Sequence, residues 1–254
     1  MLLVHGLLGY SFSWRFTIPA LAQYATVYAP DMPGTGMSDR PARMDYDLHT
    51  CAARLLQFMD KTGVESCDLT GTSHGGAVAM MAAALAPQRF RRLVLVAPVN
   101  PWSGRGKRLA PILSSPAIAP AFLVFAPQAG ILPELWLRRL YGDTRRMRPG
   151  TIEGYLKPLR RPGAYHYAMT ILQTWNHDVD ELTRALPRIA HIPTLLVWGS
   201  VDKAVYPSSA VRLKEQFRDC RLVMIEGVGH LPYEEVPDEF NRVVAEFLDN
   251  RKSQ

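Results

Sequence analysis

Short runs of apolar, β-favouring residues alternate with helix-forming segments along most of the chain. Turn residues follow each of these runs, which cover residues 2–4, 26–29, 67–70, 93–97, 194–198 and 222–225. Such alternation predicts a mostly parallel sheet whose strands are joined by crossover helices. We therefore expect an α/β fold.

Two segments have the clearest helical patterns. Residues 77–86 (AVAMMAAALA) are rich in small side chains and stop before Pro87, which predicts a helix that lies close against the sheet. Residues 238–248 place Phe240, Val243 and Phe247 on one face, which predicts an amphipathic helix.

The segment 99–186 interrupts this alternation. Half of the 20 prolines lie between residues 101 and 190, and stretches such as PELWLRRLYG and AYHYAMTILQTW predict helices without a convincing strand. The β/α pattern resumes after Ile192. We predict an α/β core formed by residues 1–98 and 187–254, with a helical cap at 99–186 inserted between two strands.

Positive charge is concentrated in the same segment. The chain carries 29 Lys and Arg against 23 Asp and Glu, and 13 of these basic but only 6 of these acidic residues lie between 101 and 190. Such a surplus could attract an acidic partner or a membrane surface, but we interpret it as solvated helix faces. Because no nucleic-acid-binding motif accompanies the charge, we expect no nucleic-acid partner.

Composition limits the remaining possibilities. A chain of 254 residues with 48% hydrophobic and 20% charged residues can bury a large core. The three cysteines (Cys51, Cys67 and Cys220) are odd in number and match no metal-ligand spacing, which predicts neither a disulfide framework nor a metal site and favours a cytoplasmic location. Without 18 consecutive apolar residues or a basic leader, we expect no membrane span and no signal peptide.

The strongest candidate for catalysis is Ser73. The motif GTSHG at residues 71–75 lies between a predicted strand and the alanine-rich helix. In a nucleophile elbow, the serine takes strained dihedral angles that project its hydroxyl above the sheet, and the flanking glycines remove side chains that would collide there. The context therefore predicts that Ser73 is a nucleophile.

A serine nucleophile needs a base, and the base needs an orienting acid. His230 lies in a glycine-rich loop after the predicted strand 222–225, and Asp202 follows the preceding strand. Both stand where ligands gather in parallel sheets. We predict His230 as base and Asp202 as acid, since Asp68, Asp178 and Asp180 do not follow the carboxyl end of a strand.

Two backbone N–H groups are needed to stabilise a tetrahedral oxyanion. The loop His5-Gly6-Leu7-Leu8-Gly9 directly follows the first strand, so we predict the N–H of Leu7 as one donor and that of His74 as the other. We expect the side chain of His5 to brace this loop. For the side chain of His74, packing or solvent contact and a role in shaping the pocket both stay open.

The sequence resembles the α/β-hydrolase superfamily, and in particular its capped members. The resemblance covers nearly the whole chain outside the cap and rests on five segments in the family's order: HGLLG, DMPGTGMSD, GTSHGG, GSVDKAVYP and GVGHLPYEE. It implies the α/β-hydrolase fold and the same roles for Ser73, Asp202, His230, Leu7 and His74. It also implies that residues 31–39 form a structural loop and that no metal or organic cofactor is required.

The segment SFSWR after HGLLG is similar to epoxide hydrolases and haloalkane dehalogenases, which use an aspartate nucleophile where this chain has Ser73. This difference favours a serine hydrolase that cleaves carboxylic esters or related acyl compounds through an acyl-enzyme. Carbon–carbon hydrolases of meta-cleavage-type diketones remain an alternative, although they often carry Asn where this chain has Thr72. A small-molecule receptor that does not turn over is a second alternative; an exposed apolar cap would favour it, but the cap is arginine-rich.

The substrate is expected to be a small or medium hydrophobic acyl compound, bound between the sheet and the cap. The oligomeric state is left unassigned. We predict that the pocket is lined by Leu8, Trp102, Trp136, Trp175, Val205 and Leu231.

The resemblance also implies an antiparallel hairpin ahead of the strand 2–4, and the chain has no residues to form it. We expect either that Met1 marks a shortened or misassigned start, or that the chain is truncated and leaves an open sheet edge beside residues 2–4.

Overall fold

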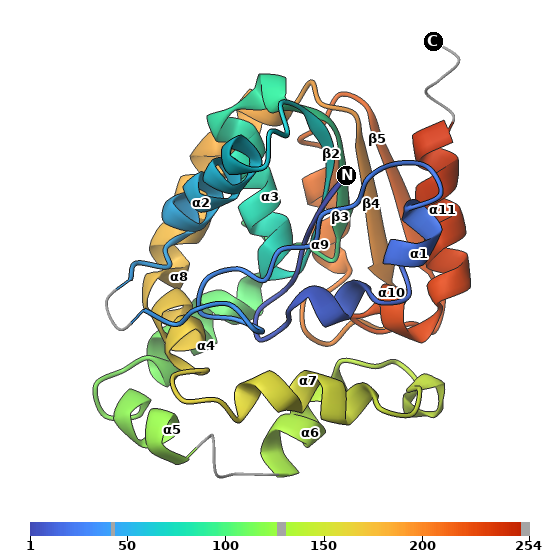
Figure 1. Ribbon diagram of the computed structural model, residues 1–254. Coiled ribbons are helices and arrows are strands. Elements are labelled where there is room, and N and C mark those ends of the chain that lie inside the picture. Colours follow the sequence, from blue (N-terminus) through green and yellow to red (C-terminus); the bar gives the residue numbers. More distant parts are fainter. Residues whose placement is uncertain (42–43, 126–130, 250–254) are drawn as a thin grey trace.

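The computed structural model describes residues 1–41, 44–125 and 131–249, and its centre is a parallel sheet (Figure 1). Neighbouring strands pair in parallel in the order β1-β2-β3-β4-β5. The five strands are β1 (Leu2–Val4), β2 (Cys67–Thr72), β3 (Phe90–Val96), β4 (Thr194–Gly199) and β5 (Cys220–Ile225). The predicted α/β fold with a parallel sheet is confirmed.

Helices cover both faces of this sheet. Successive residues of β4 alternate between two buried clusters: Leu196 and Trp198 belong to one, and Leu195 and Val197 to the other. The first cluster includes side chains from α2 (Leu48–Lys61), α3 (His74–Leu85) and α9 (Ser208–Lys214). The second includes side chains from α1 (Ile18–Leu21), α10 (Pro232–Glu235) and α11 (Pro237–Asp249). Short 3₁₀ helices complete the core at η1 (Ser11–Trp14), η2 (Pro87–Arg89) and η4 (Leu186–Ile189).

Both predicted helices are present. The alanine-rich helix is α3, and it begins at His74, directly after Ser73. Residues 74–84 are all buried, because small side chains allow the helix to pack closely against its neighbours. The amphipathic helix is α11, which buries Phe240, Val243 and Phe247.

The segment 26–29 differs from the prediction. It forms no strand but a single parallel bridge between Tyr28 and Leu2. The N–H of Leu3 donates to the carbonyl of Tyr28 at 2.8 Å, and the N–H of Tyr28 donates to the carbonyl of Met1 at 2.9 Å. These bonds cover the side of β1 that was expected to be open. On its other side, β1 pairs with β2 through all three of its residues, so only the contact with residues 26–29 is limited to a single bridge.

In its described part, 97–125 and 131–193, the chain between β3 and β4 consists of helices joined by turns and irregular segments and contains no strand. Figure 1 shows α5, α6 and α7 beyond the carboxyl ends of the strands, while α8 lies alongside α3. Since Ile171, Val179 and Leu182 of α8 belong to the core cluster, the cap boundaries at 99 and 186 stay a prediction. The helices are α4 (Gly104–Leu113), α5 (Ala119–Phe125), α6 (Ile131–Arg139), η3 (Thr144–Arg146), α7 (Thr151–Leu159) and α8 (His166–Ala185).

In the described part of the chain, none of the helices has both the length and the apolar character needed to cross a bilayer.

The cysteine side chains are free thiols. Burial raises the pKa of Cys51 to about 12 and that of Cys67 to about 11. Because the thiolate is the reactive form, both thiols are poor nucleophiles at neutral pH.

Candidate active site

Ser73 lies at the sharp turn between β2 and α3. Its backbone angles are φ 54° and ψ −125°, a strained combination for a residue with a side chain. The flanking glycines make the turn possible: a Cβ on Gly75 would overlap the carbonyl oxygens of Val4 and His5, and one on Gly71 would overlap the carbonyl of Gly75. This is the geometry of a nucleophile elbow, in which the hydroxyl is held at the carboxyl edge of the sheet.

Asp202 and His230 form a buried pair at the same edge. Nδ1 of His230 lies 2.7 Å from Oδ2 of Asp202, and each residue is 3% exposed. The other carboxylate oxygen, Oδ1, accepts hydrogen bonds from the N–H groups of Ala204 (2.7 Å) and Val205 (3.1 Å), so the carboxylate has a fixed orientation. With Nδ1–H donating to the carboxylate, Nε2 of His230 is left to act as a base.

The loops of this pair come together because Gly199, the last residue of β4, has no side chain. A Cβ at that position would overlap the carbonyl oxygens of Val228 and Gly229, which precede His230. Burial raises the pKa of the Tyr233 phenol, and both the nearby Thr72 hydroxyl and the Asp202 carboxylate influence it.

Within the described ranges, no hydrogen bond joins Oγ of Ser73 to His230. Such bonds are often long in unliganded enzymes and tighten when substrate binds.

The two predicted oxyanion donors are unpaired. Neither the N–H of Leu7 nor that of His74 donates to an acceptor among the residues that the structure describes. The loop that carries Leu7 touches the elbow, since a Cβ on Gly6 would lie 3.0 Å from Cβ of Ser73. Two free N–H groups beside a candidate nucleophile are suited to receive an oxyanion.

His5 holds this loop. Its Nε2 accepts a hydrogen bond from the N–H of Met32 at 3.1 Å, so Nδ1 carries the proton and donates to the carbonyl of Gly6 at 2.9 Å. Asp31 fixes the neighbouring loop by accepting from the N–H groups of Ser11 and Met37, each at 2.7 Å. The hydrogen bonds of His5 and Asp31 therefore fix the backbone of these two loops.

The side chain of His74 is buried against the cap. It is 4% exposed, and its ring meets that of Tyr167 edge to face, with 6.5 Å between the ring centroids. Among the described residues no group forms a hydrogen bond with it. Burial lowers the pKa of His74 to about 4, so the imidazole is neutral at physiological pH.

The lowered pKa of His74 predicts that the folded protein loses stability at acidic pH. Below pH 6.5 the unfolded His74 takes up a proton, whereas the folded one resists protonation down to about pH 4. The unfolded state therefore binds more protons in this window, and stability falls as the pH falls. We expect His74→Gln to reduce the loss of unfolding free energy between pH 7 and pH 4 by about 3 kcal/mol, measured by urea denaturation.

The exposed His191 offers a matched control. His191→Gln should leave the pH dependence of the unfolding free energy as it is in the wild type. Equal pH dependence in wild type and His74→Gln would contradict the prediction.

The predicted pocket residues differ in their surroundings. Val205 and Leu231 are buried beside the Asp202–His230 pair. Leu8 has φ 60° and packs with the cluster of Leu156 and Tyr165. Of the three tryptophans, Trp102 and Trp175 are half-buried against the core cluster, whereas Trp136 is 40% exposed on α6. A role in substrate binding stays a prediction for all six.

Glu235 was not predicted from the sequence as a site residue. Its buried carboxylate accepts three backbone hydrogen bonds: from Gly229 at 2.6 Å, from Gly142 at 2.9 Å and from Asp143 at 3.1 Å. The N–H of His230 donates to the carbonyl of Leu140 at 2.7 Å. The loop of the candidate base is thus bound to the cap segment after α6.

Glu234 was missed as well, and it joins the core to α7. It accepts from NH2 of Arg15 at 2.8 Å and from the phenol of Tyr155 at 2.8 Å, while Arg15 also donates to the hydroxyl of Thr151 at 2.8 Å. Burial raises the pKa of Glu234, although the hydrogen bonds and charge of Arg15 oppose the shift. The signal in the sequence was an adjacent pair of glutamates in an otherwise apolar stretch.

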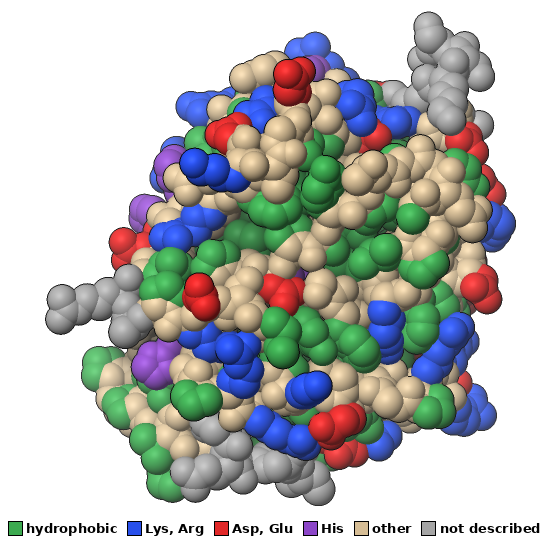
Figure 2. All heavy atoms as spheres, viewed as in Figure 1, with side chains coloured by type: hydrophobic (Ala, Val, Ile, Leu, Met, Phe, Trp, Pro, Cys, Tyr) green, Lys and Arg blue, Asp and Glu red, His purple; other side chains and the backbone are tan. Residues whose placement is uncertain are grey.

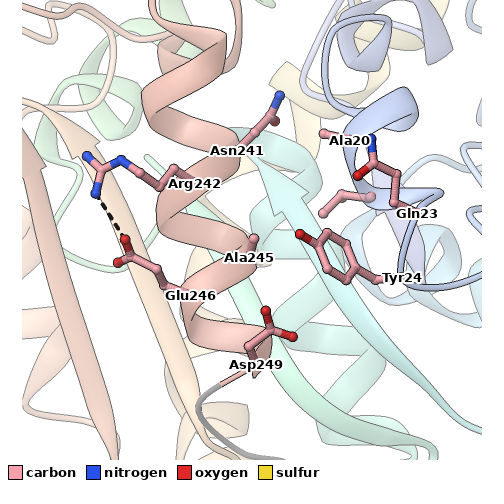
Figure 3. A pocket seen from close by; sticks show the side chains of 9 residues that line it. Ala20, Gln23, Tyr24, Asn241, Arg242, Ala245, Glu246 and Asp249 are labelled. Carbon is pink, nitrogen blue, oxygen red and sulfur yellow. Dashed lines mark hydrogen bonds and ion pairs between the residues drawn. The ribbon is translucent and has the colours of Figure 1, made fainter.

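A groove of about 450 Å³ lies elsewhere, between α1 and α11 (Figure 3). Its walls include Tyr24 and the ion pair of Arg242 with Glu246, whose nearest atoms are 3.0 Å apart. None of the candidate catalytic residues lines it, and it contains no nucleophile next to a base. The elbow therefore remains the candidate active site.

In the part of the chain that the structure describes, one group of side chains brings together donor atoms of the kinds that hold metals. His177, Asp178 and Glu181 of α8 place one such atom each within 4.8 Å of the others. None of them belongs to the candidate active site.

Known proteins resemble this chain over most of its length. A profile of the family described as alpha/beta hydrolase fold matches residues 1–237. N-formylmaleamate deformylase of Pseudomonas putida is 28% identical over 254 residues, which is 98% of this chain and 88% of that protein. The 2-hydroxy-6-oxo-2,4-heptadienoate hydrolase of Pseudomonas putida is 27% identical over 241 residues, covering 93% and 83%.

The solved structure of haloalkane dehalogenase DbeA from Bradyrhizobium elkani superposes with a TM-score of 0.86 at 22% identity, covering 99% of this chain and 90% of that one. At this identity the likeness concerns the fold alone. The profile match over most of the sequence shows that the chain belongs to the alpha/beta hydrolase fold family.

Proposed function

We propose that the chain is a serine hydrolase that cleaves a carboxylic ester or related acyl compound through an acyl-enzyme on Ser73. The observation that carries the proposal is the backbone of Ser73, whose φ of 54° is tolerated only because glycines surround it. Strain of this kind persists where function requires it. Membership in the alpha/beta hydrolase fold family supports hydrolytic chemistry.

In the proposed mechanism, Oγ of Ser73 attacks the acyl carbon while Nε2 of His230 takes the hydroxyl proton. The Asp202 carboxylate, 2.7 Å from Nδ1, stabilises the resulting imidazolium. The N–H groups of Leu7 and His74 donate to the oxyanion. The imidazolium then protonates the leaving group, and a water activated by His230 hydrolyses the acyl-enzyme.

A carbon–carbon hydrolase is the second candidate. It is favoured by the relative named 2-hydroxy-6-oxo-2,4-heptadienoate hydrolase, which matches 93% of this chain. The residue before the candidate nucleophile is the buried Thr72. The asparagine that is frequent at this position in such enzymes is therefore absent from this chain.

The receptor alternative predicts binding without turnover. Its expected hallmark, an exposed apolar cap surface, is present on this chain. We assign that surface a different role below, because the elbow and the unpaired N–H donors are features of an acyl-transfer site.

A substrate panel tests the proposal. We expect multiple turnovers on p-nitrophenyl esters of short and medium acyl chains and no cleavage of a vinylogous diketone of the meta-cleavage type. The panel should be run at several enzyme concentrations, because a true turnover rate scales with enzyme. Cleavage of the diketone alone would favour the carbon–carbon hydrolase, and a single turnover on every compound would favour the receptor.

A further inference from the structure

The outer side of α4, α5 and α6 is unusually apolar. Nine of the fifteen exposed large apolar side chains in the described part of the chain lie between residues 109 and 136. Six of them are 45% to 64% exposed, and five of these six define what we call the outer cap face: Leu109, Ile112, Phe125, Leu132 and Leu135. Exposed apolar side chains gathered in one region of a chain indicate a binding surface.

The outer cap face is distinct from the sides of α5 and α6 that pack against the rest of the chain. On α5, Phe122 and Leu123 already pack against the cluster that contains Leu8 and Leu156. On α6, Leu137 is 1% exposed and belongs to the core. These helices therefore satisfy the core with their inner sides and leave their outer sides to something else.

Charge is distributed around this face in a particular way. No Asp, Glu, Lys, Arg or His occurs from Leu109 to Pro133, whereas Lys107 and Arg108 precede this stretch and Arg138 and Arg139 follow it. Arg108 and Arg139 are exposed and have no acidic partner among the residues that the structure describes. Figure 2 shows hydrophobic side chains at the lower left, over α5, with Lys and Arg side chains beside them.

We propose that the outer cap face docks on the surface of an anionic lipid bilayer. Apolar side chains on one side of short helices enter the boundary between headgroups and acyl chains, and adjacent arginines bind lipid phosphates. The helices α4, α5 and α6 have 10, 7 and 9 residues, so they lie on the bilayer and do not cross it. Docking does not depend on the chemistry at Ser73.

A second copy of the chain fits this face less well. A symmetric dimer places the same patch of both subunits in contact. Residues 101–190 carry 13 basic and 6 acidic side chains, so two caps of the same positive charge would meet. Their repulsion opposes self-association, whereas an anionic surface attracts the cap.

Sedimentation with lipid vesicles tests the proposal. We expect the protein to bind vesicles of equal parts phosphatidylcholine and phosphatidylglycerol at 50 mM salt, and to bind pure phosphatidylcholine at least about tenfold more weakly. Raising the salt to 500 mM should weaken binding to the mixed vesicles, because the attraction of the arginines is screened.

Matched variants separate the apolar contribution to vesicle binding from the electrostatic one. Leu132→Glu and Leu135→Glu should each weaken vesicle binding at least about tenfold, whereas Val211→Glu, a change at a 56% exposed residue of α9, should not. Arg139→Gln should weaken binding about fivefold and Arg218→Gln, at another exposed arginine, should have little effect. Circular dichroism and turnover of a soluble ester check that each variant is folded.

Three results would overturn the proposal. The first is no sedimentation with the mixed vesicles at low salt, and the second is an equal loss of binding in Leu132→Glu and Val211→Glu. The third is a wild-type protein that does not bind vesicles but forms a dimer in light scattering, which Leu132→Glu dissociates. That result would assign the outer cap face to a second copy. Sedimentation with an acidic protein but not with lipid would likewise assign it to a protein partner.

Discussion

Ser73→Ala is expected to lower kcat on the order of 10⁶-fold and to abolish covalent labelling by a fluorophosphonate. The loss is large because the hydroxyl forms the bond that defines the acyl-enzyme, and no neighbouring group replaces it: burial raises the pKa of the Cys51 and Cys67 thiols and leaves them unreactive. Turnover of a p-nitrophenyl ester and intact mass after labelling are the measurements.

The control is Ser208→Ala, which removes an exposed hydroxyl at the start of α9. This variant should keep wild-type turnover and labelling. In Ser73→Ala the backbone of residue 73 keeps its φ of 54°, so removing Oγ does not change the backbone strain. The circular dichroism spectrum of the variant should therefore resemble that of the wild type. Labelling that persists in folded Ser73→Ala would refute the assignment.

Asp202→Asn is expected to lower kcat on the order of 10⁴-fold. The amide can donate to Nδ1 of His230, which stabilises the tautomer that carries its proton on Nε2 and cannot accept the proton of Ser73. The replacement also removes the negative charge 2.7 Å from the imidazole. Steady-state kinetics measure the effect, and Asp60→Asn, at a largely exposed carboxylate on α2, is the matched control.

An unchanged rate in Asp202→Asn would require another acid near the base. Asn100 follows strand β3, but its side chain is an amide and is held by three hydrogen bonds. It donates to the carbonyl of Pro98 at 2.9 Å and to Oγ of Ser209 at 3.1 Å, and accepts from the N–H of Trp102 at 3.0 Å. We therefore expect no rescue from this position.

Much of the fold could be predicted from local patterns. Strand β4 was recognised from a short apolar run bounded by turn residues, and α3 from its alanines and the proline that ends it. The segment 26–29 is apolar like a strand but forms only one bridge with β1, whereas β1 pairs with β2 through all three of its residues. Pairing partners are a tertiary property that composition does not encode.

The candidate site was predictable where glycines indicate a tight turn of the backbone. Gly71 and Gly75 beside a serine indicated the elbow, and the order of Ser73, Asp202 and His230 followed from their places after successive strands. Glu235 was not predictable in this way. Its three acceptor contacts reach backbone groups on the His230 loop and on a cap segment about 90 residues away in sequence, which come together only when the cap has folded onto the core.

The sequence by itself determined the order of the elements, the strained position of Ser73 and the location of the positive charge in the cap. The tertiary structure alone decided which side of each cap helix is buried. Apolar residues occur on all sides of α5 and α6, so periodicity could not separate Phe122 and Leu137, which pack inward, from Phe125 and Leu132, which face water. The physical reason is that burial depends on what lies opposite a side chain, and contacts distant in sequence supply it.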